Sequence, residues 1–575
     1  MSTVFIPRAL TRAGGLLCLL PLLAGSLQAA APTDSIQAVL RTRLEMAHAG
    51  SAEALAVDDA RMRSGALLTR FYVGRRFEPA WTDDTAPTPR ADSLVAALRA
   101  AEQHGLRPSD YQVSTLDSLR AVLQAQADAG EPLDPRRLSD FELLCTDGFF
   151  LYGTHLLHGR LDSETHTPIG TADRRADDLL NQLRAVEDGT PLRTALATLA
   201  PSNPEYTALT RLRAEYQSIA SEGNWPTLPD GPKLERGVQS DRVPPLRRRL
   251  QATDDLSDTA AADRTVFDST LAVAVTRFQA RHGLDTDGIV GPATRAALNV
   301  PVADRIQQLE VNLERWRWLP RDLGTPHVRV NIAGFELQVM EKDTEVLKMR
   351  VVAGTPYRQT PVFSDQISYL VFNPYWNLPT RIATQDKLPA FKSDPSRVDA
   401  QGYEVLRGWG ADARPIDPST IDWDRLSASN FPYRLRQRPG PQNALGQVKF
   451  MFPNAYSVYL HDTPARALFG RSERSFSSGC IRVERPLDLA AFLLRENEGW
   501  SPARIRSTVG GSREQTVVLN RNVPVHLLYW TAWMDGDTAQ FRRDVYSRDG
   551  PVATALRRPL PSPERWAEPP TSVGE

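Results

Sequence analysis

A cysteine in a polar turn is the residue of this chain best suited to covalent chemistry. Cys480 lies in the stretch 475–483, SFSSGCIRV, between a glycine and a branched apolar residue. A thiol becomes a strong nucleophile only as the thiolate, so it needs a base or a cation nearby. His461 ends a predicted strand upstream, and its imidazole can take that proton and return it to a leaving amine. We therefore predict that Cys480 is a nucleophile and that His461 is its base.

The residues beside the cysteine suit the same chemistry. Gly479 lets the backbone approach a substrate carbonyl, and the amides of Gly479 and Cys480 can hold a developing oxyanion. Losing one such donor typically costs roughly 2.7–4 kcal/mol of barrier. Arg482 can pair with a substrate carboxylate, although a solvated surface charge is the alternative. Ser478 can equally be a simple turn residue.

The bulk composition excludes some classes of partner. The 575 residues are too many for one core, so we expect several domains. With 68 basic and 69 acidic residues the formal net charge is −1, which gives no electrostatic footprint for nucleic acid or an anionic membrane surface. We expect no nucleic acid, metal or cofactor.

The N-terminal segment indicates export. Arg8 and Arg12 precede a short apolar run, 16–23, and small residues follow, which is the layout of a signal peptide over 1–31. An uncleaved inner-membrane anchor is the alternative, although a span needs roughly 20 apolar residues. Exported proteins usually pair their cysteines. Cys145, however, lies in an apolar helical stretch and is predicted to be a core residue, which leaves Cys480 as a free thiol.

The region 32–230 has the pattern of a helical domain. In 92–105 the apolar residues fall on one helix face, with Asp92 as the predicted cap and Gly105 as the stop. His155 and His158 have no third partner nearby in the sequence, so we expect structural roles for them.

A small helical module follows at 234–300. Leu234 and Leu250 belong to a predicted first helix, 267–281 is the second, and the third begins near Thr294 after Pro292. The stretch AVTRFQARHGLDTDGIVGPATRAALN resembles the three-helix peptidoglycan-binding module of cell-wall enzymes. The resemblance implies a wall ligand, and a spacer role is the alternative.

The remainder reads as a β-rich domain. After a connecting helix within 301–325, period-two alternation over 326–535 predicts mainly antiparallel strands with one buried face. The segment 387–434 breaks this rhythm and is predicted to be a lid-like capping insertion. For 536–575 we expect a C-terminal segment and a proline-rich tail.

The site motif also carries a resemblance. YLHDTPARALFGRSERSFSSGCIRV resembles the active-site signature of L,D-transpeptidases with a YkuD-type catalytic domain. NPYWNLPTRIA, FYVGRRFEPAW and YWTAWMD are similar to the large YcbB-type periplasmic members. The implied fold is multidomain α+β: a helical scaffold, the peptidoglycan-binding module and a mainly antiparallel β catalytic domain. Many members have histidine where this chain has Ser478, so His461 must act as the base. Tyr459 shares the strand face of His461 and is expected to line the site.

The resemblance implies a reaction. Cys480 attacks the carbonyl before a terminal D-alanine in a peptidoglycan stem peptide, D-alanine leaves, and a diaminopimelate amine resolves the thioester into a 3→3 cross-link. The implied setting is cell-wall organisation and cell shape in the periplasm, beside other wall-synthesis proteins. Three alternatives stay open: an L,D-carboxypeptidase or hydrolase, a transpeptidase that anchors a lipoprotein, and a non-catalytic wall-binding scaffold.

Overall fold

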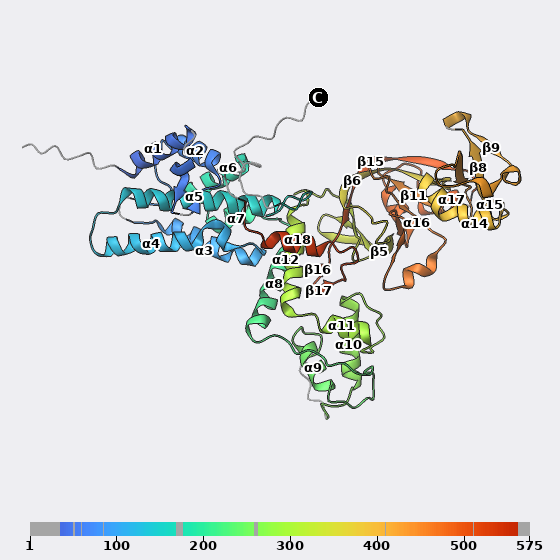
Figure 1. The fold of residues 1–575 in the computed structure, drawn as a ribbon, viewed down its shortest axis with the longest axis horizontal. Helices are drawn as coiled ribbons and strands as arrows, with labels where there is room; N and C mark the ends of the chain where they lie inside the picture. The colour runs from blue at the N-terminus through green and yellow to red at the C-terminus, as the bar shows by residue number, and fades with distance from the viewer. Residues whose placement is uncertain are drawn as a thin grey trace, which may run out of the picture.

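The chain folds into a helical region, a small helical module and a β-rich region. The computed structural model describes residues 35–561, apart from 50–51, 59, 84–85, 168–175, 258–262, 409 and 510. The predicted signal peptide at 1–31 and the end of the predicted tail lie outside these residues. Figure 1 shows the helical region at one end, the β-rich region at the other and the small module beside the helices that join them. Among the described helices, none has the length and apolar character needed to cross a membrane.

The N-terminal region is built around one buried helix, α5 (Pro135–His158). Cys145 is fully buried in it and forms no disulfide, as the core prediction requires. His155 is also buried, and its ring contacts the Tyr111 hydroxyl at 2.9 Å. The surrounding helices are α1 (Ile36–His48), α2 (Gly65–Gly74), α3 (Pro89–Arg99), α4 (Val113–Asp128), α6 (Ala176–Glu187), α7 (Leu192–Leu199) and α8 (Pro204–Ser221), with a short hairpin of β1 (Ala56–Val57) and β2 (Ala60–Arg61).

Helix α3 corrects one predicted boundary. It begins at Pro89 after Thr88 as the N-cap residue, so Asp92 lies in the first turn and is not the cap. Proline suits this first position because its missing N–H would be unpaired there anyway. Gly105 closes the following 3₁₀ turn in a left-handed conformation, as predicted.

The small module contains three helices packed on their own core. They are α9 (Val243–Gln251), α10 (Ser269–Arg281) and α11 (Pro292–Leu298). Leu246, Val275 and Phe278 are among the buried residues that join them. Leu234 does not extend the first helix as predicted, because it pairs with Val290 in an isolated β-bridge.

Helix α12 (Val302–Arg317) joins the parts of the molecule. It packs against α8, against α18 (Asp549–Arg557) and against the hairpin of β16 (Ala532–Asp535) and β17 (Thr538–Phe541). These C-terminal elements lie beside α12 and the helical region (Figure 1), and α18 was not predicted from the sequence.

The C-terminus also reaches the helical region directly. Arg160, which is fully buried, pairs with Asp110 at 2.6 Å. The same guanidinium donates to the carbonyl of Arg558 at 2.6 Å and to that of Ala555 at 3.3 Å. The last described turns of the chain therefore complete a buried ion pair of the first domain.

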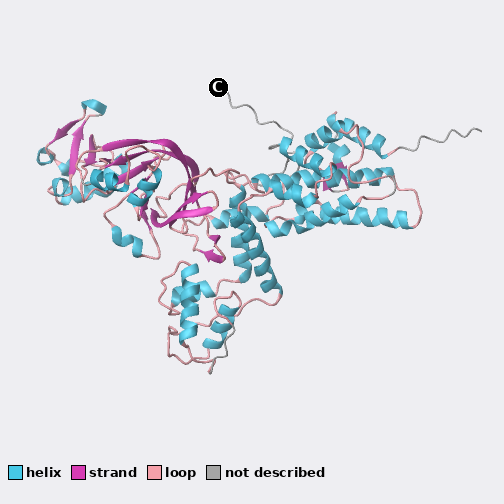
Figure 2. Cartoon of the chain, turned by 180° about the vertical axis from the view of Figure 1, so that it is seen from behind, coloured by secondary structure: helices cyan, strands magenta, loops and turns pink. Residues whose placement is uncertain are grey.

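The β-rich region is a nine-stranded sheet with the order β13-β5-β14-β12-β11-β6-β15-β3-β4. Because β4 also pairs with β5, the sheet closes on itself around a buried apolar core. Most pairs are antiparallel, as predicted, while β12–β14, β3–β15 and β13–β5 are parallel. Figure 2 shows the strands gathered in this region. They are β3 (His327–Asn331), β4 (Glu336–Glu341), β5 (Thr344–Gly354), β6 (Phe363–Phe372), β11 (Val448–Met451), β12 (Leu460–His461), β13 (Ser475–Ser477), β14 (Ile481–Val483) and β15 (Gln515–Leu528), with helices α16 (Pro486–Leu493) and α17 (Pro502–Val509) beside them.

The capping insertion has its own sheet and core. Its strands pair in the order β7-β10-β8-β9, and Phe391, Tyr403 and Trp423 are among its buried residues. The unit therefore extends beyond the predicted 387–434, because β7 pairs with β10. Its elements are β7 (Trp376–Asn377), α13 (Thr380–Ile382), the π-helix η4 (Ala383–Lys387), α14 (Leu388–Ser393), α15 (Arg397–Ala400), β8 (Tyr403–Arg407), β9 (Arg414–Ile416) and β10 (Tyr433–Gln437).

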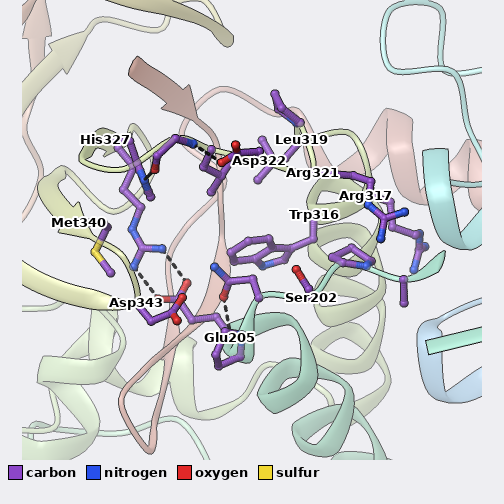
Figure 3. A pocket seen from close by; sticks show the side chains of 18 of the residues that line it. Ser202, Glu205, Trp316, Arg317, Leu319, Arg321, Asp322, His327, Met340 and Asp343 are labelled. Carbon is purple, nitrogen blue, oxygen red and sulfur yellow. Dashed lines mark hydrogen bonds and ion pairs between the residues drawn. The ribbon is translucent and has the colours of Figure 1, made fainter. Parts of the chain in front are cut away.

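A pocket of about 280 Å³ lies where the helical region meets the sheet. An ion pair between Arg329 of β3 and Glu205 of α8 bridges the two regions there. Neither Cys480 nor His461 lines this pocket, so it is separate from the predicted site. Its walls include Ser202, Glu205, Trp316, Arg317, His327 and Met340, as Figure 3 shows.

Candidate active site

The predicted site residues share one face of the sheet. Strands β12 and β14 pair in parallel with Leu460 opposite Ile481 and His461 opposite Arg482. Leu460 and Ile481 point into the core of the sheet. Since alternate residues of a strand point to opposite faces, His461 and Arg482 lie on the outer face, and Cys480 just precedes this strand. The fold therefore brings the predicted nucleophile and the predicted base to neighbouring strands.

His461 is held as a neutral base. Its Nδ1 lies 2.5 Å from the carbonyl of Asp462, and because a carbonyl only accepts, Nδ1 must carry the proton. The lone pair is therefore on Nε2. Burial, helped by the charge of Arg482, lowers the pKa of His461 from 6.5 to about 3. The Asp462 carboxylate does not orient the ring, because it accepts the Gln447 N–H at 2.9 Å.

The nucleophile turn depends on a glycine. Gly479 has φ of +116°, a conformation that L side chains rarely adopt. Its own N–H donates to Ser477 Oγ at 3.1 Å, so this amide already has an acceptor. The Cys480 N–H has no acceptor among the described residues, so of the two amides expected to hold an oxyanion, Cys480 supplies the free one.

The Cys480 thiol is half-buried. Its Sγ lies 3.9 Å from the carbonyl of Ser457. Burial raises the pKa of Cys480 above 9.0, although hydrogen bonds from Tyr459 and the charge of Arg482 oppose this shift. At neutral pH the thiol and the imidazole are thus both uncharged at rest. Such a pair can react by general-base transfer of the thiol proton as the sulfur attacks.

A loop from β5 supports the nucleophile turn. Thr360, fully buried, donates from Oγ1 to the Gly479 carbonyl at 2.8 Å and accepts the Gly354 N–H at 3.0 Å. The N–H of Thr355 donates to the Ser477 carbonyl at 3.0 Å. Fixing the Gly479 carbonyl also fixes the direction of the Cys480 N–H, because both belong to one planar peptide. The sequence carried no signal for Thr360.

Ser478 is exposed and contacts an arginine that sequence reasoning also missed. Arg358 donates from Nη1 to Ser478 Oγ at 3.0 Å. The same guanidinium forms a two-bond ion pair with Asp386 of η4, at 2.6 and 2.8 Å. One arginine thereby connects the capping insertion to the residue two positions before Cys480.

Tyr459 and Arg482 complete the predicted set. The ring of Tyr459 meets that of His461 edge to face, with centroids 5.7 Å apart. The strand predicted to end at His461 is reduced to two residues, because Ser457 has φ of +56° and the Asn454 side chain accepts the Val458 N–H. Arg482 is half-buried and forms no ion pair with any described residue.

Comparison with known proteins places these residues within one domain. An L,D-transpeptidase catalytic domain, YkuD, matches residues 325–518. A scaffold domain matches 66–212, and the "Putative peptidoglycan binding domain" matches 239–298.

Individual relatives agree with the family matches. A Haemophilus influenzae protein described as "Putative L,D-transpeptidase" is 37% identical over 249 residues, which is 43% of this chain and 49% of that protein. The chain thus spans about half the length of that curated relative.

Solved L,D-transpeptidases share little with the chain as a whole. The Xylanimonas cellulosilytica structure is 16% identical, covering 52% of this chain and 98% of its own, with a TM-score of 0.17. The Stackebrandtia nassauensis structure is 13% identical, covering 53% of this chain and 96% of its own, with a TM-score of 0.21. Both scores are too low for an argument from overall structure. On the family matches, the chain carries a YkuD-type L,D-transpeptidase catalytic domain joined to a peptidoglycan-binding domain and a helical scaffold.

Proposed function

We propose that this protein is a peptidoglycan L,D-transpeptidase that works through a thioester on Cys480. The observation that carries the proposal is that the fold brings two reactive groups close together along the sheet, in a domain matched by that family. Cys480 lies on a glycine turn with a free N–H, and His461 lies on the neighbouring strand with an unprotonated Nε2.

The proposed acylation uses the groups described above. As Sγ of Cys480 attacks the carbonyl before the terminal D-alanine, its proton passes to Nε2 of His461. The Cys480 N–H stabilises the developing oxyanion. When the C–N bond breaks, His461 returns the proton to the departing amine, so D-alanine leaves neutral at nitrogen and the thioester remains.

The second half of the proposed reaction reverses these roles. An amine of a second stem peptide loses a proton to His461 and attacks the thioester carbon. The C–S bond breaks, Cys480 recovers its proton, and a 3→3 cross-link results. We place this activity in the periplasm, in agreement with the predicted signal peptide.

The direct test is the product formed from a disaccharide-tetrapeptide by the purified protein. We expect a dimer lacking one D-alanine in the mass spectrum. A tripeptide alone would show that water resolves the thioester, as in a carboxypeptidase. Transfer to a supplied lysine peptide would show a lipoprotein-anchoring activity. An unchanged substrate would favour the alternative that the protein is a non-catalytic wall-binding scaffold.

Two cysteine variants separate chemistry from folding. Cys480→Ala should abolish turnover without changing the melting temperature. Cys145→Ala is the matched control, because this cysteine is buried in α5, far along the chain from the site. It should keep the activity, with some loss of stability from the small cavity. Full activity of Cys480→Ala would refute the mechanism.

The three-helix module is proposed to hold the enzyme on the wall. Its core is separate from that of the nine-stranded sheet, although α10 also contacts β17, so we expect the sheet to fold when 234–300 is removed. Deletion should weaken co-sedimentation with isolated sacculi while turnover of a soluble stem peptide persists. Unchanged sedimentation would assign the module a spacer role.

A further inference from the structure

Two cations flank His461 on the outer face of the sheet. Lys449 of β11 lies directly opposite His461, and Arg482 of β14 lies opposite it on the other side. Residues opposite each other on adjacent strands point to the same face, and their Cα atoms are about 5 Å apart. The three side chains therefore form a row across the sheet with the imidazole in the middle.

Among the described residues, neither cation forms an ion pair with an acid. In the part of the chain that the structure describes, Lys449 Nζ forms no ion pair or hydrogen bond and lies 6.0 Å from the centre of the Tyr459 ring. Arg482 forms none either, and its buried Nε lacks any acceptor. Burial lowers the pKa of Lys449, and the negative charge of Glu514 opposes this shift without forming an ion pair with the lysine. The Glu514 carboxylate instead accepts the Tyr375 N–H at 2.8 Å.

A buried arginine elsewhere in the same sheet has the counter-charge that these two cations lack. Arg329, which is buried in β3, forms an ion pair with Glu205 at both carboxylate oxygens. Burying a charge without a counter-charge costs free energy. Burial accordingly lowers the pKa of Lys449 and that of Arg482. Two neighbouring cations without a counter-charge favour the binding of an anion between them.

The geometry of the proposed reaction identifies that anion. His461 must reach the nitrogen of the departing residue to return a proton. In a terminal amino acid the carboxyl carbon lies only two bonds from that nitrogen, about 2.5 Å away. The carboxylate of the departing residue must therefore lie close to His461, within reach of its two flanking cations.

We propose that Lys449 and Arg482 bind the terminal carboxylate of the donor peptide, and that Lys449 is a specificity-determining residue. The inference rests on the proposed function and goes beyond it, because it makes a free C-terminal carboxylate the feature that the site recognises. A peptide whose terminus is blocked as an amide leaves both cations without a counter-charge.

The test compares two donors that differ only in this group. The full chain is assayed with a stem tetrapeptide ending in D-alanine and with the same peptide ending in D-alaninamide, following release of the terminal residue. We expect kcat/KM to favour the free acid by about 10- to 100-fold, the usual effect of a hydrogen bond to a charged group. Lys449→Met should lower kcat/KM for the acid by a similar factor and leave the amide nearly unchanged.

Controls separate recognition from folding. Lys449→Arg keeps the charge and should restore the preference, while Lys233→Met, in an exposed ion pair remote from the sheet, should change neither substrate. Lys449→Met should melt at or above the wild-type temperature, because it removes an uncompensated charge. A uniform loss on both donors, or a wild type without preference, would overturn the inference alone. Failure of the wild type to process either donor would overturn the proposed function and this inference together.

Discussion

Replacing Thr360 by valine should weaken both the fold and the activity, although Thr360 touches no reacting atom. The hydroxyl holds the Gly479 carbonyl at 2.8 Å and accepts the Gly354 N–H at 3.0 Å, in a fully buried position. Valine has nearly the same shape but offers neither bond. Thr360→Val therefore leaves one buried donor and one buried acceptor unpaired.

The magnitude follows from those two groups. A buried polar group left unsatisfied costs about 1–3 kcal/mol, so the two together should lower the free energy of unfolding by about 2–6 kcal/mol. For a domain of this size that lowers the melting temperature by about 4–20 °C. Freeing the Gly479–Cys480 peptide also misdirects the Cys480 N–H, which should lower kcat about 10- to 100-fold.

The assay is D-alanine release from a tetrapeptide at saturating concentration, with thermal melting in parallel. Thr360→Ser is the matched control, because it keeps the hydroxyl and removes only a methyl group. It should retain most of the activity. A valine variant with wild-type kcat and wild-type melting temperature would show that Thr360 does not support the nucleophile turn.

Further predictions concern pH and the capping insertion. Because burial lowers the pKa of His461 to about 3 and raises that of Cys480 above 9.0, kcat/KM should stay level between about pH 4 and 8; an inflection near 6.5 would contradict this. Below pH 6.5 the imidazole of His461 binds a proton in the unfolded chain but not in the folded one. As pH falls from 6.5 to 3, His461 should therefore lower the free energy of unfolding by about 1.4 kcal/mol per pH unit. The His461→Gln variant should lack this contribution to the pH dependence of stability. Arg358→Ala should raise protease sensitivity in the capping insertion and lower kcat several-fold, and Asp386→Asn should do so more weakly; equal protease resistance in all three proteins would refute the connection.

The sequence predicted the elements whose residues are periodic. Helix α10 and the strands β3 to β5 follow the apolar spacing closely, because each buries one regular face. The two-residue strands gave no such signal. β7 was missed for that reason, and with it the true extent of the capping insertion.

Within the site, motif residues could be found and their supports could not. Cys480 and His461 stand out by residue type, whereas Thr360, Arg358 and Lys449 are ordinary residues placed by strand pairing far along the chain. The engagement of the Gly479 N–H by Ser477 depends on a backbone angle that no spacing reveals. Of the two amides expected to hold the oxyanion, only that of Cys480 therefore lacks an acceptor among the described residues.

The bonds from Arg160 to the carbonyls near the C-terminus bear on the order in which this chain can mature. Domains generally form as units in the order of their synthesis. Here the buried guanidinium of the first domain gains two of its acceptors, at Ala555 and Arg558, only from residues made long after that domain. Until α18 has been made, Arg160 has the Asp110 carboxylate but not these two carbonyls as acceptors. A chain interrupted before Ala555 would lack those two acceptors, so we expect its N-terminal domain to be less stable than that of the longer chain.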